Sequence, residues 1–218
     1  MIFLLLSPIT YATPAIQDWP LPNEDQRQAL TQNYIETHCG PTCLVDDKYP
    51  YDMTPKMVVV HWTAGGSAKS AWNTFSSATL HGRSDIKNGG ALNVSSQFLV
   101  DRDGQIFQLR PETHISRHCI GLNHLSIGIE NVADGEKFPF TEAQLKANVE
   151  LIRYLSKKYP ITHVIGHHEH NLFESHAYFQ ETNPRYRTVK IDPGEAIMSQ
   201  IRAEITDLSL NGPPEDTP

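Results

Sequence analysis

The segment THVIGHHEH at residues 162–170, followed by TVKIDPG at residues 188–194, decides how this chain is interpreted. In the first segment a short apolar run ends in a glycine, and His167 comes directly after it. Asp192 lies 25 positions further along the chain. Imidazole nitrogens and carboxylate oxygens are good zinc ligands, and a catalytic zinc needs three protein ligands and an open position. These two segments therefore supply two candidate ligands.

The third candidate ligand is His61, which ends the apolar run that begins at Met57. A continuous apolar run of this length is expected of a β-strand that is buried on both faces. In open α/β sheets, functional sites form outside the carboxyl ends of the strands. We therefore expect His61 and His167 to lie at two strand ends of one sheet.

The assignment of ligands leaves alternatives open. Asp192 precedes Pro193, and an aspartate before a proline is also typical of a helix N-cap. His168, His170 and His176 are spare imidazoles, and one of them could replace a named ligand.

Two further residues complete a possible hydrolase. In the strand-like segment SIGIE at residues 126–130, alternation places Ser126, Gly128 and Glu130 on one face. A glutamate beside a glycine can lie under a substrate and act as the base, although an edge-strand glutamate that faces water is the alternative. Lys190 points to the same side as Asp192 if the segment is extended, so its ammonium group could stabilise an oxyanion.

The remaining pattern predicts further helices and strands. An asparagine cap at Asn23, a serine start near Ser67 and a capping box at 141–144 each begin a helix. The expected helices cover 23–38, a segment from about 67, 142–158 and 193–205, and the expected strands cover 57–60, 93–100, 105–109, 126–130 and 163–166. Asp103-Gly104 predicts a hairpin between two of these strands.

Composition limits the function classes. One main domain is the natural expectation for 218 residues, and the net charge of -7 argues against a nucleic-acid partner. Residues 1–15 contain no charge and resemble a signal peptide, possibly truncated, although a disordered leader is the alternative. The segment is too short to span a membrane. Cys39 and Cys43 could close a disulfide in an oxidising compartment, or remain reduced together with Cys119.

Four motifs in order resemble the zinc-dependent N-acetylmuramoyl-L-alanine amidases of the amidase-2 family, which is related to the peptidoglycan recognition proteins and the T7 lysozyme type of amidase. The motifs are HWTA from His61, SIGIE at 126–130, GH at 166–167 and KxDPG at 190–194. The resemblance spans about residues 55–205. It implies an α/β fold with a central mixed β-sheet flanked by helices.

The resemblance also implies a function and a set of roles. The expected reaction is cleavage of the amide between N-acetylmuramic acid and L-alanine, in peptidoglycan or muropeptides, outside the cytoplasm in the periplasm or the medium. One Zn²⁺ per chain would be held by the three candidate ligands, with Glu130 as catalytic glutamate and Lys190 as oxyanion-stabilising lysine. His118 matches a residue that lines the substrate groove in many members, and Trp62 and Thr63 are further substrate-binding candidates. A recognition protein of the same fold that binds without cutting is the alternative.

The resulting division of the chain has four parts. They are a signal peptide at 1–15, an N-terminal helical extension at 16–54, a catalytic domain at 55–207 and a disordered tail at 208–218. One departure from the family pattern is a long connection between the second histidine and the aspartate. Residues 171–188 therefore look like an inserted loop, which could cover or shape the groove.

Overall fold

The computed structural model describes residues 13–40, 43, 45 and 48–215, so the expected signal peptide lies mostly outside the described residues. The strands are β1 (Ile16–Asp18), β2 (Met57–Trp62), β3 (Phe98–Val100), β4 (Ile106–Gln108), β5 (Ser126–Asn131) and β6 (His163–Gly166). The α-helices are α1 (Glu24–His38), α2 (Ala68–Ser76), α3 (Glu142–Lys158) and α4 (Glu195–Glu204). Short 3₁₀ helices are η1 (Lys87–Gly89), η2 (His167–Phe173) and η3 (Thr206–Leu208).

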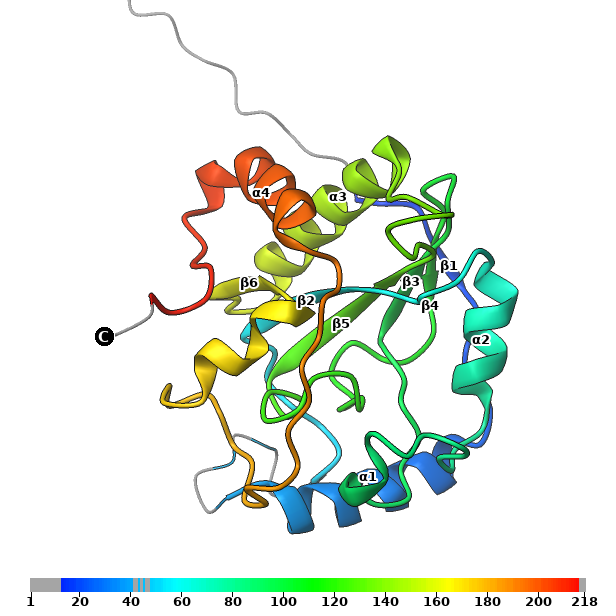
Figure 1. The fold of residues 1–218 in the computed structure, drawn as a ribbon, viewed down its shortest axis with the longest axis vertical. Coiled ribbons are helices and arrows are strands. Elements are labelled where there is room, and N and C mark those ends of the chain that lie inside the picture. Colours follow the sequence, from blue (N-terminus) through cyan, green and yellow to red (C-terminus); the bar gives the residue numbers. More distant parts are fainter. Residues whose placement is uncertain (1–12, 41–42, 44, 46–47, 216–218) are drawn as a thin grey trace, which may run out of the picture.

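The strands form one six-stranded sheet in the order β1-β4-β3-β5-β2-β6 (Figure 1). Strands β6, β2, β5 and β3 run parallel, whereas β4 is antiparallel to β3 and β1 is parallel to β4. The prediction of a central mixed sheet flanked by helices is therefore confirmed. Strand β2 lies between β5 and β6, which explains its continuous apolar run.

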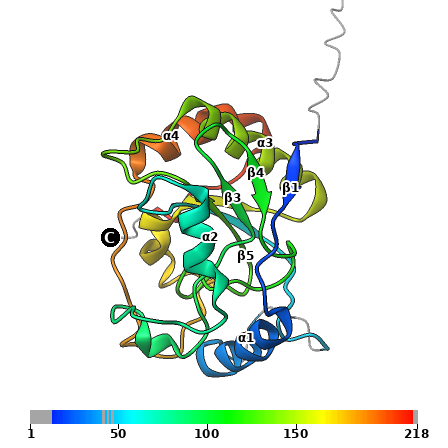
Figure 2. The same cartoon turned by 90° about the vertical axis from the view of Figure 1, so that its right-hand side faces the viewer.

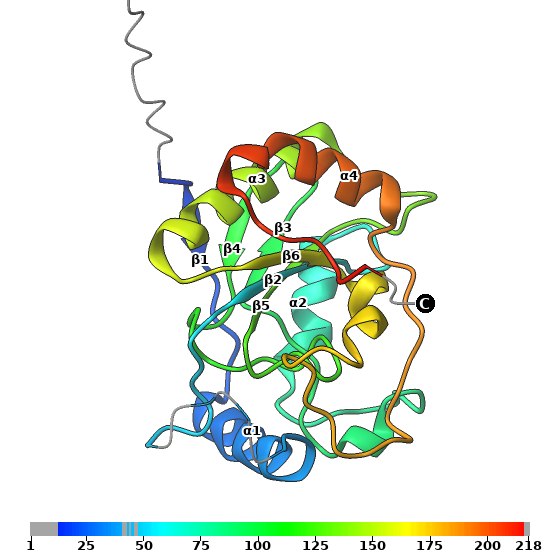
Figure 3. The same ribbon diagram turned by 90° about the vertical axis from the view of Figure 1, so that its left-hand side faces the viewer.

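Each face of the sheet packs against a different layer. Helices α3 and α4 cover one face, and Figure 3 shows them on the opposite side of the sheet from α2 and η2. Val58 and Val60 of β2 belong to the core under α3 and α4. Met57 and Val59 point to the other face, where Phe173 of η2 joins their cluster. His61, two positions after Val59, points to the same second face and belongs to the site described below.

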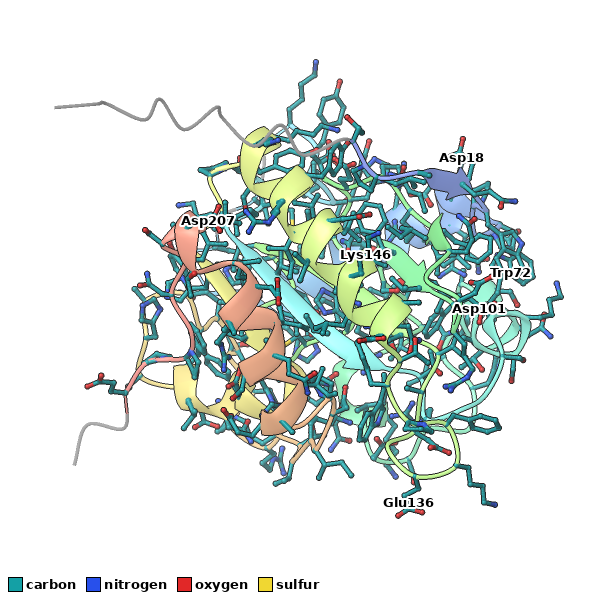
Figure 4. All side chains as sticks on the ribbon, turned by 90° about the horizontal axis from the view of Figure 1, so that it is seen from above. Asp18, Trp72, Asp101, Glu136, Lys146 and Asp207 are labelled. Atoms are coloured by element: carbon teal, nitrogen blue, oxygen red, sulfur yellow. A yellow bond between two sulfur atoms is a disulfide. The ribbon has the colours of Figure 1, made fainter. Side chains whose placement is uncertain are left out.

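Helix α3 begins at the predicted capping box, because the Thr141 hydroxyl and the Gln144 side chain each bind the backbone of the other residue. Seen from above, α3 and α4 lie side by side over the sheet, with Lys146 on the outer side of α3 (Figure 4). Leu151, Ile152 and Leu155 of α3 are fully buried, whereas Leu145 is only partly buried. The buried Gln144 side chain donates to the carbonyls of β3 and of the segment after β5.

The N-terminal segment is more than a helical extension. Helix α1 forms as predicted, but β1 also joins the edge of the sheet, parallel to β4 (Figure 2). The guanidinium of Arg27 donates to the carbonyls of Pro22 and Ser76 and so connects α1 with the end of α2. Asn23 occupies the N-cap position, but its φ is 63° and its side chain makes no capping bond. The expected asparagine cap is therefore wrong in its mechanism.

The strand expected at 93–100 is wrong for its first five residues. Polar side chains there bind the backbone of other segments instead. The Asn93 amide donates to the carbonyls of Thr74 and Ser77, and the Gln97 amide donates to the carbonyl of His114. The hairpin between β3 and β4 is confirmed.

The end of the chain also differs from the prediction. The expectation of a disordered tail at 208–218 does not hold for Asn211. Its N–H donates to the Thr162 carbonyl and its carbonyl accepts from the N–H of Val164, each at 2.9 Å. The segment after η3 thus lies along β6, because β6 is an edge strand with free backbone groups.

The structure contains a disulfide between Cys39 and Cys43, whose Cα atoms are 5.6 Å apart. Cys119 is buried and free. Within the described part of the chain, no helix is both long and apolar enough to cross a bilayer.

Candidate functional site

Three neighbouring strands bring the candidate residues to one edge of the sheet. His61 of β2 is the register partner of Glu130 of β5. On the other side, Val60 is the partner of Gly166, the last residue of β6, so His167 follows at the level of His61. The carboxyl ends of β5, β2 and β6 therefore present a glutamate and two histidines side by side, as the strand pattern predicted.

Asp192 completes a compact group of donor atoms. Its Oδ2 atom lies 3.4 Å from Nδ1 of His61 and 3.2 Å from Nδ1 of His167. The ligand atoms of these residues all lie within 4.8 Å of one another. The backbone N–H of His168 donates to the Asp192 carbonyl at 2.8 Å and holds the aspartate segment against η2. The structure thus brings together the three residues that the sequence singled out as ligands.

The charge of this group fits a cation. Burial raises the pKa of Asp192, but the hydrogen bond of His167 and the charge of the neighbouring histidines outweigh it and hold that pKa well below its usual range. Burial, together with the charge of His61, lowers the pKa of His167 to about 3. A carboxylate that stays ionised beside a neutral imidazole is the donor chemistry that a zinc site requires.

The hydrogen bonds of His61 fix which of its nitrogens is free. Nε2 of His118 lies 3.2 Å from the Ser126 carbonyl, which can only accept, so this nitrogen carries the proton. Burial holds the pKa of His118 well below its ordinary value, so its Nδ1 has a lone pair. That Nδ1 lies 3.0 Å from Nε2 of His61, which must therefore donate. In neutral His61 the lone pair is then on Nδ1, toward Asp192, and this arrangement fits a metal ligand.

Glu130 lies in the interior of the sheet, because β5 is flanked by β3 and β2. The alternative of an edge-strand glutamate is therefore wrong. Its Oε2 atom is buried and has no hydrogen-bond partner among the described residues. Burial raises the pKa of Glu130 to about 7. A carboxyl group with this pKa can both take up and release a proton near neutral pH.

Gly128 has a different purpose from the one expected. A Cβ atom at this position would lie 2.9 Å from the ring of His118. The missing side chain therefore makes room for the His118 ring, and the substrate does not occupy that space. His118, which the family resemblance placed in the substrate groove, lies against His61.

The donor group opens into a cleft of about 500 Å³. Trp62, Thr63 and Lys190 line this cleft, as do the three candidate ligands, Glu130 and His118. Exposure alternates along the segment before Asp192. Val189 and Ile191 are 87% and 74% exposed, whereas Lys190 lies against the cleft with its Nζ atom 3.9 Å from Asp85. The predicted orientation of Lys190 on the same side as Asp192 agrees with this alternation.

Two arginines near the cleft were not identified as functional from the sequence. Arg83 lines the cleft and its Nη2 pairs with Asp85 Oδ2 at 2.8 Å. The buried Arg117 guanidinium donates to the Gly90 carbonyl and to the Tyr186 hydroxyl, at 3.1 and 2.8 Å. Arg117 directly precedes His118, in the pair that the resemblance matched to the substrate groove, but it was given no role of its own. Arg83 belongs to no motif, so only the tertiary contacts reveal its position.

Residues 171–188 run away from the cleft and return to it. Glu181 pairs with His38 at the end of α1, at 2.9 Å, and Thr182 donates its N–H to the His38 carbonyl. The segment then returns along the front of the sheet, where Tyr186 and Thr188 line the cleft (Figure 1). The loop therefore shapes one wall of the groove, as expected.

The spare histidines in this region do not join the donor group. The closely spaced group contains only His61, His167 and Asp192 among the residues that the structure describes. His170 uses its Nδ1 on the His167 carbonyl, and His176 packs against His163.

Comparisons with known proteins agree with this geometry. A family model described as N-acetylmuramoyl-L-alanine amidase matches residues 51–195. The endolysin of Escherichia phage T7 is 35% identical over 88 residues, which are 38% of this chain and 58% of that protein. The endolysin of Enterobacteria phage T3 is 34% identical with the same coverage. The chain thus spans a little over half the length of the curated relatives it matches.

Among solved structures, the endolysin amidase LysCS from Clostridium intestinale URNW is similar with a TM-score of 0.54 and 21% identity, over 90% of this chain and 99% of that one. Bumblebee PGRP-SA is similar with a TM-score of 0.50 and 16% identity, over 87% and 94%. At these identities the likeness shows a shared fold.

Proposed function

We propose that this chain, which belongs to the N-acetylmuramoyl-L-alanine amidase family, hydrolyses the amide between the lactyl group of N-acetylmuramic acid and L-alanine in peptidoglycan or muropeptides. The observation that carries the proposal is the convergence of His61, His167 and Asp192 at one edge of the sheet, with Glu130 on the adjacent strand. A metal-assisted amide hydrolase needs such a donor set, a base and a partner for the oxyanion.

One Zn²⁺ per chain is the proposed cofactor, held by His61, His167 and Asp192. Bound zinc would supply Lewis-acid chemistry that activates water and polarises the scissile carbonyl. The ionised carboxylate and the lone pair of His61 Nδ1 both support this assignment. In this arrangement His118 orients the metal ligand His61. We propose this positioning role for His118 in place of substrate contact.

Glu130 moves the proton in the proposed reaction. As the water oxygen bonds to the carbonyl carbon, the Glu130 carboxylate takes one water proton. As the carbon–nitrogen bond breaks, the same proton passes to the leaving nitrogen. The products are the lactyl carboxylate and the free amino group of L-alanine. The pKa of about 7 and the unpartnered Oε2 atom of Glu130 support this role.

Lys190 and the groove residues are proposed to handle the substrate. The ammonium group of Lys190 would stabilise the negative charge that develops on the carbonyl oxygen. Trp62 and Thr63 line the cleft next to His61 and would contact the sugar or the peptide. These residues line the same cleft as the candidate ligands.

We place the protein outside the cytoplasm, in the periplasm or the medium, where peptidoglycan is accessible. The Cys39–Cys43 disulfide supports this, since disulfides persist in oxidising compartments. The relatives from phages T7 and T3 are endolysins, which is compatible with a cell-wall substrate for this chain.

The proposal is tested by metal analysis combined with digestion of purified muropeptides. The native chain should contain about one zinc and release L-alanine peptides from the sugar. Glu130→Gln should keep its zinc and lose activity by on the order of 100-fold or more, because a general base contributes at least that much. Muropeptide binding without any cleavage by the native chain would instead indicate a recognition protein. Full activity of Glu130→Gln would remove the assigned base.

A further inference from the structure

A second group of soft ligand atoms lies away from the cleft. Cys39 and Cys43 come from the end of α1 and the loop after it, and His124 comes from the loop that precedes β5. One ligand atom from each of these residues lies within 4.8 Å of the other two. None of them belongs to the site at the strand ends.

His124 has an unsatisfied nitrogen in this group. The side chain is buried, with 2% of the residue exposed, and its Nε2 has no hydrogen-bond partner among the residues that the structure describes. Buried polar atoms without a partner are rare, and each calls for an explanation such as a bound ion. Burial lowers the pKa of His124 to about 4, so the imidazole is neutral near pH 7 and keeps a lone pair.

The surroundings leave room for a small ion. A cavity of about 10 Å³ is lined by Tyr34, His38, Cys39 and His124, with other residues of the same two segments and Gln180. A volume of this order holds about one water-sized probe sphere, and a zinc ion is smaller than a water molecule. Two thiolates on a tetrahedral zinc lie roughly 3.8 Å apart, given zinc–sulfur bonds of about 2.3 Å. That spacing is compatible with the 5.6 Å between the Cα atoms of the cysteines.

We propose that reduction of the Cys39–Cys43 disulfide turns this cluster into a second metal site, which binds Zn²⁺ through two thiolates and His124. Two molecules of a small thiol supply the two electrons and two protons, and leave as one disulfide. The two cysteine thiols that form lose their protons when the metal binds, so two protons are released per ion. Thiolate and imidazole donors are the set that favours zinc over magnesium or calcium.

The site would connect two segments that meet at the cleft wall. Asn123, next to His124, accepts from the N–H groups of His118 and Cys119 and donates to the Tyr34 hydroxyl of α1. A metal held by the two cysteines and His124 would therefore add a second connection between these two segments, which the disulfide does not make. Reduction would remove the covalent bond between Cys39 and Cys43. Metal binding would then link this segment to the loop that carries His124.

Cobalt provides a direct test, because Co²⁺ bound to thiolates gives a strong near-ultraviolet charge-transfer absorption. Nitrogen and oxygen ligation at His61, His167 and Asp192 gives no such absorption, so the two sites are distinguished in one spectrum. The full-length chain is reduced with a phosphine, freed of metal and titrated with Co²⁺, then with Zn²⁺. We expect one thiolate-bound cobalt per reduced chain, displaced by zinc, and no such absorption for the oxidised chain.

Variants assign the ligands. His124→Gln should weaken cobalt binding at this site by more than about 100-fold, since even changes behind the ligands cost about 10–100-fold. His170→Gln is the matched control. His170 is also buried, and its Nε2 has no hydrogen-bond partner among the described residues, but it does not belong to the cluster with the two cysteines. Cys119→Ala controls for the remaining thiol. Both controls should keep the absorption.

Two results would overturn the proposal. One is a reduced chain that shows no thiolate-to-cobalt absorption although its circular dichroism is that of the oxidised chain. The other is equal cobalt affinity in the native chain and in His124→Gln. If His124→Gln does not fold, Cys39→Ser and Cys43→Ser serve in its place, and each should remove part of the absorption.

Discussion

Nδ1 of His118 lies 3.0 Å from Nε2 of His61, and the Ser126 carbonyl fixes the proton on the far nitrogen of His118. Because the carbonyl can only accept, the tautomers of both imidazoles follow from one backbone oxygen. In neutral His61 the lone pair is thereby placed on Nδ1, the nitrogen that faces Asp192. Such preorganisation is the usual task of residues that lie behind metal ligands.

This relationship predicts that His118 affects metal affinity. His118→Phe removes the acceptor for His61 Nε2, so we expect zinc affinity to fall about 10–100-fold, measured by competition with a chromogenic chelator. At saturating zinc, much of the activity should return. A substrate contact would give the opposite pattern, namely a raised KM with unchanged zinc affinity, and that pattern would refute the positioning role.

Lys190 should affect the chemical step. We expect Lys190→Met to lower kcat by roughly 100–1,000-fold, as loss of an oxyanion partner does, with one zinc still bound. Lys190→Arg keeps the charge and should restore part of the activity. Equal loss in both variants, together with loss of zinc, would show that the lysine supports the fold of the 188–194 segment instead.

Zinc should also stabilise the folded chain. A ligand that binds only the folded state adds about 2.7 kcal/mol at a concentration 100 times its dissociation constant. We therefore expect zinc to raise the Tm of the metal-free, oxidised chain, measured by calorimetry. Asp192→Asn removes the ionised ligand and should lose most of that rise. An equal rise in this variant would place the stabilising ion elsewhere.

The sequence predicted the parts of the site that depend on strand ends. His61 and His167 follow apolar runs, and parallel strands necessarily bring their carboxyl ends to one edge, so the local pattern was sufficient. Residue alternation also pointed to Glu130 and Lys190, and the family resemblance matched them to catalytic roles. Their proposed roles stay predictions, although the structure does place both at the cleft.

The sequence was less informative where long-range contacts decide. The pairing of His118 with His61 joins residues 57 positions apart, and no local pattern encodes it. The contact of Gly128 with the His118 ring was also missed, because the path of the irregular segment before β5 follows no periodic pattern. The pairing of Asn211 with β6 depends on a free edge, which appears only once the sheet is assembled.

A last prediction concerns stability and pH at the start of α1. Oε1 of Glu24 lies 2.8 Å from Nδ1 of His114 and 2.9 Å from Nη2 of Arg110. Burial raises the pKa of Glu24, but the hydrogen bond to His114 and the charge of Arg110 outweigh it and lower that pKa to about 2. Because the folded-state pKa lies below the value of 4.5 expected for the unfolded chain, the stabilisation is present above pH 4.5 and is lost as the pH falls toward 2.

Glu24→Gln should therefore lower the free energy of unfolding at pH 7 by about 1–2 kcal/mol, a value reduced for the partial exposure of the group. In urea unfolding measured from pH 7 down to pH 2.5, the difference between variant and native chain should shrink, because below pH 4.5 Glu24 takes up a proton in the unfolded chain and stays mostly ionised in the folded one. Asp25→Asn is the control, since Asp25 lies in the same helical turn but is exposed. It should cost only a few tenths of a kcal/mol through the helix dipole. A difference for Glu24→Gln that stays constant with pH would mean that shape rather than charge makes this contact stabilising.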